Sequence, residues 1–321
     1  MEMFKLLPST VSTIWGGQKL KKEYGIETDL ENCAEAWMLS CFPGRESVAS
    51  TGVFKGLNLK QIIDTCGSSI LGKHAEMFSD FPVLIKFIDA ADDLSVQVHP
   101  DNEYAKQYNG GFGKTECWYI LDCEPGAKII YGFNGDYTRE EFAQAIAQNK
   151  IEDIVNYVEV SKGDFFFIES GTLHAICKGI VLAEVQQNSD ITFRAYDYNR
   201  FDVRCNGPRP LHIKETLDVT MRHPPQKRND LCRVVFSEKN AKVTELVKTE
   251  LFTVNKYDVN SEFLSSVNSD SFVHLLVTDG NGTIKSGETV LELSKGEGVF
   301  IPADTGEFTL TGSFSLLETR I

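Results

Sequence analysis

The stretch GDFFFIESGTLHAI, residues 163–176, has a weaker second copy in GEGVFIPADTGEFTL, residues 296–310. Both copies begin with a glycine and an acidic residue, and both place Phe-Ile three positions after the acid. The segments before them also correspond, with CWYILDCEPGAKI at 117–129 aligned on FVHLLVTDGNGTI at 272–284. Because an internal repeat is the signature of one structural unit built more than once, we expect two β-sandwich modules in tandem.

The two copies differ at a position that matters for chemistry. The second copy has Glu307 where the first has His174, so a site built on that histidine would exist once, and we expect the second module to bind no metal. The first copy also carries a helical segment at 138–158 between its parts. We therefore expect a catalytic domain at 1–225, enlarged by helices, and a degenerate second module at 226–321.

Short apolar segments, rich in β-branched and aromatic residues, alternate with Gly, Pro, Asn and Asp along the chain. Examples are FPVLIKFI (81–88), CWYILD (117–122), AKIIYGF (127–133), DFFFIES (164–170) and IVLAEVQ (180–186). This pattern favours a mainly β, jelly-roll fold over a parallel sheet with crossover helices. Apolar residues at three- and four-residue spacing predict helices only within 58–72, 138–158 and 210–221.

The composition restricts the possible partners. Of the 321 residues, 42% are hydrophobic and 24% are charged, which is typical of a globular protein. With 32 basic and 46 acidic side chains the net charge is −14, and such a field repels nucleic acid and anionic lipid. We expect no nucleic-acid or membrane partner, and an anionic small substrate would need a local basic pocket.

The cysteines and the amino terminus indicate a cytoplasmic protein. The eight cysteines are scattered, without a C-x-x-C pair that would suggest a zinc knuckle or a redox motif. The first residues, MEMFKLLPSTVSTIWGG, lack the pattern of a signal peptide, and no stretch approaches the roughly 20 apolar residues of a membrane span. We therefore expect free thiols and a cytoplasmic location.

A candidate metal site combines residues from three predicted strands. In SVQVHPD, Gln97 and His99 alternate with valines and so point to the same side of a strand. Glu116 begins another strand, and His174 ends a strand turn. Two imidazoles, a carboxylate and an amide oxygen suit a divalent ion such as zinc. From spacing alone, an ordinary polar row on a half-buried strand is the more common explanation of Gln97 and His99.

Several motifs, taken in order, carry a resemblance to a known family. They are WGGQKL (15–20), AEAWMLS (34–40), LSVQVHPD (94–101), KTECWYIL (114–121), GTLHAI (171–176) and EVQQNSDITFRAYDYNR (184–200). Over most of its length the chain resembles the type I mannose-6-phosphate isomerases in their short bacterial form. The resemblance implies a cupin fold, one Zn²⁺ per chain held by Gln97, His99, Glu116 and His174, and a sugar phosphate as substrate.

By the same resemblance, further residues are expected to line the substrate pocket: Ser95, Lys86, Lys114, Glu184, Asp190 and Arg194. Two departures are visible. Thr115 stands where many eukaryotic relatives have proline, which leaves the path of this loop open, and the long helical insertion of those relatives is absent. Contacts made by that insertion cannot be transferred to this chain.

The chemistry implied by the resemblance is proton transfer between C1 and C2 of an aldose or ketose phosphate through an enediolate. Zinc would act as a Lewis acid, Glu184 or Lys114 would be the base, and Asp190 and Arg194 would serve ring opening. The sequence does not choose between the two candidate bases. Arg194, Lys86 and Ser95 would bind the phosphate, whereas we expect Arg204 and Arg209 to pair with nearby acids such as Asp197 and Asp202.

Two other functions compete with the isomerase. A sugar-phosphate-binding cupin without turnover, such as a sensor, needs the pocket but not the full catalytic set. An iron-dependent cupin oxygenase is also compatible with two histidines and a carboxylate, although the Gln97 ligand and the arginine-rich segment at 194–209 disfavour it. We expect a monomer or a weak homo-oligomer. Structural roles are expected for the remaining conspicuous residues: Trp15, Trp37, Trp118, Cys117, His74, His212, His223 and His274.

Overall fold

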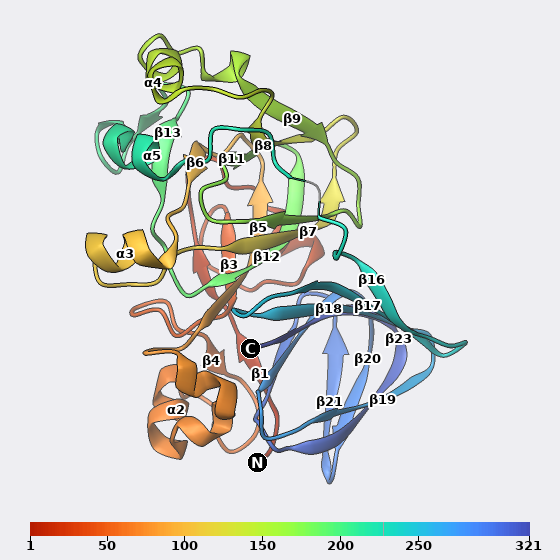
Figure 1. Cartoon of the computed structure of the whole chain (residues 1–321). Coiled ribbons are helices and arrows are strands. Elements are labelled where there is room, and N and C mark those ends of the chain that lie inside the picture. Colours follow the sequence, from red (N-terminus) through yellow and green to blue (C-terminus); the bar gives the residue numbers. More distant parts are fainter. Residues whose placement is uncertain (227) are drawn as a thin grey trace.

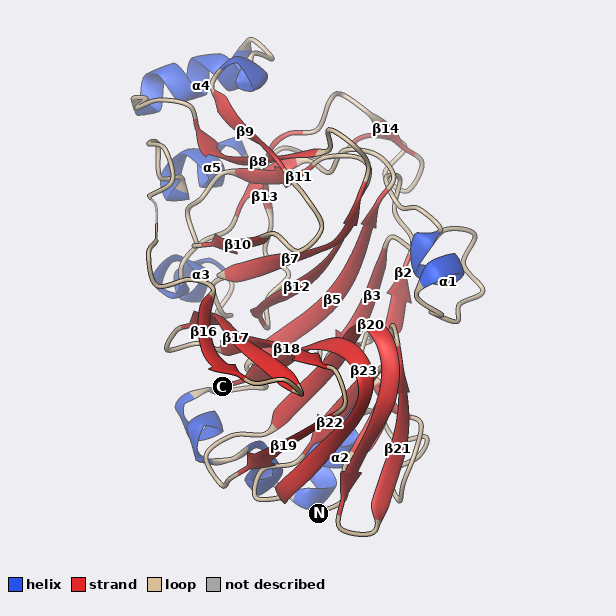
Figure 2. Ribbon diagram, turned by 90° about the vertical axis from the view of Figure 1, so that its right-hand side faces the viewer, coloured by secondary structure: helices blue, strands red, loops and turns tan. Residues whose placement is uncertain are grey.

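The computed structural model describes residues 1–226 and 228–321, and strands dominate it (Figure 1). The first module is a sandwich of two sheets. Its larger, antiparallel sheet has six strands in the order β10 (Phe165–Ile168), β7 (Glu116–Cys123), β12 (Ile180–Gln187), β5 (Val83–Ala90), β3 (Glu35–Leu39) and β2 (Ser9–Val11). In Figure 2 most of these strands lie side by side, above the strands of the second module.

The facing sheet has five strands. Their order is β13 (Phe193–Tyr196), β6 (Val96–Val98), β11 (His174–Ile176), β8 (Lys128–Phe133) and β9 (Val155–Glu159). Apolar side chains from both sheets fill the interior of the sandwich, among them Ile88, Trp118, Ile129, Ile176 and Leu182. A two-stranded pair, β14 (Phe201–Asp202) and β15 (Gly207–Pro208), lies in the loop that follows β13.

The second module is built on a ten-stranded sheet. Its main path runs β16 (Arg233–Ser237), β17 (Ala241–Lys248), β18 (Thr253–Val259), β23 (Gly306–Arg320), β20 (Val273–Ser286), β22 (Gly298–Ile301), β1 (Phe4–Leu7) and β4 (Val48–Ala49). The remaining strands are β19 (Glu262–Val267), which pairs with β23, and β21 (Thr289–Ser294), which pairs with β20. The sheet encloses its own core, which includes Val273, Leu275, Ile301 and Leu316.

The amino-terminal strand belongs to the second module by hydrogen bonding. In β1, Phe4 is paired with Phe300 of β22, and Leu6 is paired with Ala49 of β4. The chain therefore begins in the sheet of the second module, then forms the first module, and finally completes the second module. The division at residue 225 stays a prediction, since strands on both sides of it share one sheet.

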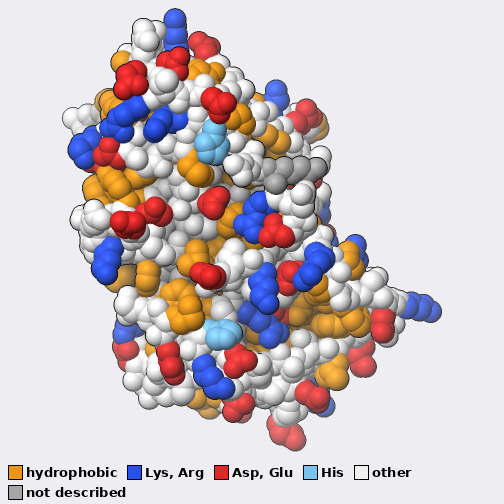
Figure 3. Space-filling view, viewed as in Figure 1, with side chains coloured by type: hydrophobic (Ala, Val, Ile, Leu, Met, Phe, Trp, Pro, Cys, Tyr) orange, Lys and Arg blue, Asp and Glu red, His pale blue; other side chains and the backbone are white. Residues whose placement is uncertain are grey.

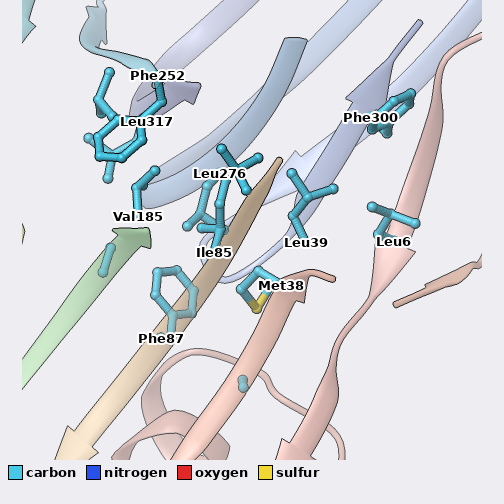
Figure 4. Close-up of a cluster of buried hydrophobic side chains, with 14 of the residues drawn as sticks. Leu6, Met38, Leu39, Ile85, Phe87, Val185, Phe252, Leu276, Phe300 and Leu317 are labelled. Atoms are coloured by element: carbon cyan, nitrogen blue, oxygen red, sulfur yellow. The ribbon is translucent and has the colours of Figure 1, made fainter. Parts of the chain in front are cut away.

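A single apolar core joins the two modules (Figure 4). Side chains alternate faces along a strand, so Ile85 and Phe87 of β5 enter this core while Lys86 and Ile88 face the sandwich interior. Strands β5 and β12 are buried at every residue for this reason. Burial on both faces explains why they appear in the sequence as continuous apolar runs rather than as alternating ones.

Helices are few, and all of them precede β16 in the chain. They are α1 (Lys19–Glu23), α2 (Leu59–Cys66), α3 (Asn102–Tyr108), α4 (Arg139–Ala147) and α5 (Ile213–Val219), with 3₁₀ turns η1 (Ser68–Leu71), η2 (Lys73–Met77) and η3 (Ile151–Asp153). Ala105 of α3 and Phe142 of α4 pack on the outer face of the five-stranded sheet. The helices predicted within 58–72 and 210–221 are confirmed as α2 and α5.

The helix predicted across 138–158 is wrong in its second half. A capping box of Thr138 and Glu141 starts α4, but the helix ends at Ala147 and Asn149 adopts a left-handed φ of 55°. After η3 the chain becomes strand β9, which pairs with β8. Its sequence VNYVE is rich in β-branched and aromatic residues, and pairing with a sheet edge outweighed the helical spacing.

The internal repeat corresponds to equivalent strand pairs. In the first module Ile168 of β10 is paired with Glu116 of β7, and in the second Ile301 of β22 is paired with Val273 of β20. The sequence alignment would place residue 271 opposite Ile301, so the observed partner Val273 is shifted by two residues. A shift by two residues leaves each side chain on the same face of the sheet. The predicted mainly β architecture of two jelly-roll modules with a few helices is confirmed.

Other features agree with the composition. All eight cysteines are free thiols. None of the described helices is long and apolar enough to cross a membrane. On the face shown in Figure 3, acidic and basic side chains are interspersed, so the net charge of −14 is not concentrated in one patch there.

We predict that Phe300→Ala lowers the free energy of unfolding by about 3–5 kcal/mol, as expected for a buried Phe removed from a core. The Phe300 ring stacks on Phe4 and Phe272, with centroids 5.4 and 5.0 Å away, and so connects the amino-terminal strand to the second module. Urea unfolding measures the change. The control Leu264→Ala removes a side chain that is 59% exposed, and a loss for Phe300→Ala no larger than in this control would contradict the role of the joint core.

Candidate active site

Three potential metal ligands from three separate segments meet inside the first module. His99 follows β6, Glu116 opens β7 and His174 opens β11. One ligand atom from each lies within 4.8 Å of the others, and all three side chains are buried. The Nε2 atoms of His99 and His174 are 3.6 and 3.5 Å from the two carboxylate oxygens of Glu116. Within the described residues this is the one group of three His, Cys, Asp or Glu side chains arranged in this way.

The sandwich itself brings these side chains together. Gln97 of β6 is the direct partner of His174 in the five-stranded sheet, while Glu116 belongs to the opposite sheet, where it is paired with Gln186. The ligand group therefore spans the interior between the two sheets. Its geometry depends on the strand register of both, because a slip by one residue would turn each side chain to the other face.

Backbone carbonyls orient both imidazoles. His99 Nδ1 lies 2.7 Å from the carbonyl oxygen of Ile191, and His174 Nδ1 lies 2.8 Å from that of Thr172. Each Nδ1–H donates to its carbonyl, which leaves the lone pair of Nε2 directed toward Glu116. Burial lowers the pKa of His99 well below its ordinary value and lowers that of His174 to about 4. Both rings are therefore neutral at pH 7, as metal ligands must be.

The side chains of this group fit a divalent cation. His174 Nε2 and Glu116 Oε1 are fully buried and have no hydrogen-bond partner within residues 1–226 and 228–321. Leaving such a buried group unsatisfied costs about 1–3 kcal/mol, and coordination of a metal would satisfy both. Two neutral imidazoles and a carboxylate are a donor set typical of zinc. Gln97 lies beside them, with its Oε1 accepting a hydrogen bond from Ser95 Oγ at 3.2 Å.

Lys114 lies against the ligand group. Its Nζ is 2.7 Å from Glu116 Oε2, 3.1 Å from His99 Nε2 and 3.9 Å from Glu184 Oε1. Burial by itself would lower the pKa of this ammonium, but the charges of Glu116 and Glu184 outweigh it and raise the pKa above its ordinary value. The two buried carboxylates, rather than burial itself, therefore set the direction of this pKa shift.

Glu184 is part of a polar row that crosses the six-stranded sheet. Trp118, Glu184, Lys86 and Trp37 are direct neighbours on four adjacent strands and therefore share one face. Trp118 Nε1–H donates to Glu184 Oε2 at 2.9 Å, and Lys86 Nζ lies 3.7 Å from Oε1. Burial, helped by the charge of Glu116, raises the pKa of the Glu184 carboxyl despite the nearby Lys114 and Lys86.

A cavity of about 350 Å³ opens beside this row and the ligand group. It falls within the size range of small-molecule sites. The residues that line it include every pocket residue inferred from the resemblance, namely Ser95, Lys86, Lys114, Glu184, Asp190 and Arg194, together with Gln97. Asp190 is exposed at the rim, and the buried Nε of Arg194 has no hydrogen-bond partner among the described residues.

Comparison with known proteins identifies the family. Residues 3–126 match the description Phosphomannose isomerase type I, catalytic domain, and residues 242–321 match Mannose-6-phosphate isomerase, cupin domain. The mannose-6-phosphate isomerase of Streptococcus mutans is 36% identical over 96% of this chain and 94% of its own. The chain belongs to the type I phosphomannose isomerase family.

Solved structures agree with this assignment. The crystal structure of the mannose 6-phosphate isomerase from Bacillus subtilis superposes with a TM-score of 0.91 at 33% identity, covering 100% of both chains. A zinc-bound mannose 6-phosphate isomerase has the same fold, with a TM-score of 0.80 at 20% identity and 99% coverage of both chains. The predicted cupin class is thereby confirmed.

Several cavity residues of this phosphomannose isomerase family member were missed in the sequence. Glu35 lies in the motif AEAWMLS, and alternation with Trp37 would have placed it on the cavity face. His212 was expected to be structural, yet it lines the cavity and its Nδ1 accepts the backbone N–H of Arg194 at 3.2 Å. Arg45, from the loop after β3, also lines the cavity. No local pattern marked His212 or Arg45.

Other conspicuous residues lie around the ligand group without joining it. Cys117 points away from the ligand group into the joint core, and Trp118 packs edge-on against His174 with ring centroids 5.4 Å apart. Arg209 binds Asp197 and Arg204 binds Asp202, as expected, although both arginines also line the cavity. Trp15 is buried and borders the cavity too.

A larger cavity, of about 760 Å³, lies between the turns η1 and η2 and the segment at 302–304 of the second module. None of the candidate ligands, and none of the pocket residues inferred from the resemblance, lines it. Size alone therefore does not identify the active site. The candidate site is the smaller cavity, because the buried ligand group and the carboxyl with a raised pKa adjoin it.

We predict that Asp197→Asn lowers the free energy of unfolding at pH 7 by about 1–3 kcal/mol, since the buried carboxylate binds two arginines. Its oxygens accept from Arg200 Nη2 at 2.7 Å and from Arg209 Nη2 at 2.6 Å. Burial would raise the pKa of Asp197, but Arg209 and Arg200 outweigh it and lower that pKa. The stabilisation is therefore complete above the unfolded-state pKa and is lost as the pH falls through the lower folded-state value.

Urea unfolding of the wild type and of Asp197→Asn between pH 7 and pH 3 tests this effect. The difference between them is expected to narrow below about pH 4, where the unfolded-state carboxyl becomes protonated. The exposed Asp136, changed to Asn, is the matched control. A difference that stays constant across this range would show that the carboxylate charge is not what stabilises the segment.

Proposed function

We propose that the protein is a zinc-dependent isomerase that interconverts mannose 6-phosphate and fructose 6-phosphate. The observation that carries this proposal is the buried group of His99, Glu116 and His174 beside Glu184 and Lys114 at a cavity with a basic lining. The names of the relatives that cover nearly the whole chain support the same reaction.

His99, Glu116 and His174 would hold the zinc ion, with the amide oxygen of Gln97 as a fourth ligand. When bound, zinc supplies a Lewis acid that polarises the substrate carbonyl and stabilises the negative charge of an enediolate. The zinc-bound relative of the same fold supports the choice of metal. The carbonyls of Ile191 and Thr172 hold both rings with Nε2 toward Glu116, so the imidazoles would not need to turn to serve as ligands.

Glu184 is our candidate for the base that moves the proton between C1 and C2. One of its oxygens is held by Trp118, while the other, Oε1, keeps no hydrogen bond in the described structure and is available to the substrate. Lys114 Nζ is instead engaged with Glu116 and His99. Its ammonium would stabilise negative charge that develops on the substrate oxygens. Proton transfer by a positioned carboxylate is typically worth a factor of about 10² to 10⁴ in rate.

The residues at the mouth of the cavity would act on the ring form of the sugar and on its phosphate group. Asp190 and Arg194 lie on one short segment at the cavity mouth, where an acid and a base for ring opening are needed. Arg194 and Ser95 remain proposed phosphate contacts. Lys86 lies 3.3 Å from Glu35 and 3.7 Å from Glu184, so its charge is largely balanced and its main role would be to orient Glu184.

The competing functions fit less well. A binding protein without turnover would not need the buried group of Glu184, Lys114 and three metal ligands, each of which is costly to bury. An iron-dependent oxygenase is disfavoured by membership in the phosphomannose isomerase family. Metal analysis of protein purified without added metal separates zinc from iron, and a coupled assay for fructose 6-phosphate separates the enzyme from a sensor.

We predict that His174→Ala lowers the bound zinc from one ion per chain to almost none and lowers turnover by more than about 100-fold. Changes to groups that merely support a metal ligand already cost about 10- to 100-fold. Elemental analysis, the coupled assay and the melting temperature give the three readouts. His223→Ala, at an exposed histidine, is the control. Full turnover in metal-free His174→Ala would refute the mechanism.

We predict that Arg194→Ala keeps its zinc but loses about 10²-fold or more in kcat/KM, as on removal of a group that stabilises a transition state. The reason is that Arg194 lines the cavity without touching the three buried ligands. The zinc content and the kinetic constants are measured on the same preparation. Arg139→Ala, which removes an exposed arginine of α4, is the control. Unchanged kinetics would exclude Arg194 from the site.

A further inference from the structure

The basic side chains that line the active-site cavity divide into two groups. Those that lie within ion-pair distance of a carboxylate are Lys86 with Glu35 and Glu184, Lys114 with Glu116 and Glu184, Arg204 with Asp202, and Arg209 with Asp197. In the described part of the chain, the other two cations, Arg45 and Arg194, have no such partner. These two guanidinium groups therefore offer the cavity's uncompensated positive charge.

A tight turn fixes the position of Arg45. The backbone N–H of Arg45 donates to the carbonyl of Phe42 at 2.9 Å, and Gly44 has a φ of 77°. With Pro43 and Gly44 at its two central positions, the turn has the sequence typical of type II. Ser47 N–H donates to Ser40 O at 2.9 Å and closes the base of the loop. The loop is thus anchored to the end of β3.

An aromatic contact holds the side chain of Arg45. Its guanidinium carbon lies 4.8 Å from the centroid of the Trp37 ring, within the range of a cation–π interaction. Trp37 is itself held, because its Nε1–H donates to Glu35 Oε2 at 2.7 Å and Phe42 packs edge-on against it. A guanidinium that stacks through its face keeps its N–H groups free along the edge, where a phosphate can accept two of them.

We propose that Arg45 binds the phosphate monoester of the sugar substrate together with Arg194 and selects phosphorylated over free sugars. The two arginines come from the two sheets of the sandwich, Arg45 from the loop after β3 and Arg194 from β13, so a phosphate between them would bridge the cavity. Arg45 is exposed, whereas the ligand group is buried. A hexose 6-phosphate has the matching polarity, since its reacting carbons and its phosphate lie at opposite ends.

This inference rests on the proposed function and adds a specificity residue to it. The test uses the zinc-loaded protein, with Arg45→Gln, Arg45→Lys and the control Arg233→Gln. Arg233 is an exposed arginine paired with Glu245 in the second module, so its change removes the same charge far from the cavity. The measurements are kcat and KM for mannose 6-phosphate, the inhibition constant of inorganic phosphate, and the melting temperature.

For Arg45→Gln we expect KM and the phosphate inhibition constant to rise about 10-fold or more, as on loss of a charge-assisted hydrogen bond, with kcat within about twofold of wild type. Arg45→Lys keeps the positive charge but loses the paired N–H groups of the guanidinium, so we expect an intermediate rise in KM and in the phosphate inhibition constant. Arg233→Gln should match the wild type. The proposal would be overturned if KM and the phosphate inhibition constant of Arg45→Gln and Arg45→Lys both lay within twofold of those of Arg233→Gln.

Calorimetric titration with inorganic phosphate and mannose 6-phosphate separates this inference from the proposed function. A wild-type protein that binds both without turnover, and loses affinity in Arg45→Gln, would refute the isomerase and support the role of Arg45. An active wild type with unchanged phosphate affinity in Arg45→Gln would refute only the role of Arg45. Should Arg45→Gln melt much earlier than wild type, Arg45→Lys gives the decisive comparison.

Discussion

The structure depends on keeping one carboxylate, that of Glu116, buried among groups that compensate it. A buried charge is costly unless it is paired; here the ammonium of Lys114 pairs with it, and a divalent cation held with the two neutral imidazoles that face it would complete the compensation. The surrounding groups come from both sheets of the first module, and His174 lies more than fifty residues from Glu116 in the chain. A one-residue change of register in either sheet would turn these side chains away from Glu116. The strand register that the fold requires is therefore also the one that the site requires.

The second module contributes to this arrangement without touching the ligand group. Its apolar side chains, such as Leu276 and Leu317, cover the outer face of the six-stranded sheet, whose inner face carries Glu184 and Lys86 (Figure 4). A strand that is packed on one side and functional on the other has little freedom to shift, because interiors are close-packed. The pairing of β1 with β22 also ties the amino-terminal strand to the sheet of the second module.

The cavity shows how an acidic protein with a net charge of −14 can accept an anion. Most of its basic side chains are balanced by carboxylates, and these pairs orient groups rather than attract substrate. Among the described residues, the basic side chains of the cavity that lack a carboxylate partner are Arg45 and Arg194. Burial raises the pKa of the Glu184 carboxyl, whereas Arg45 is exposed. In the proposed mechanism, proton transfer between C1 and C2 takes place at the buried end of the cavity, and the phosphate is bound nearer its mouth.

The sequence by itself predicted the fold class, the repeat and two helices, because alternation and turn residues are local properties of the chain. Its motifs indicated most residues of the candidate site through the family resemblance. It failed where distant segments decide the outcome. Pairing with β8 turned the end of the predicted helix at 138–158 into β9, and β1 joined the second sheet across nearly the whole chain. His212 and Arg45 enter the cavity for the same reason, since no local pattern marks them and only packing brings their loops there. The pKa of Lys114 likewise depends on Glu184, seventy residues away, because electrostatic interaction follows distance in space and not along the sequence.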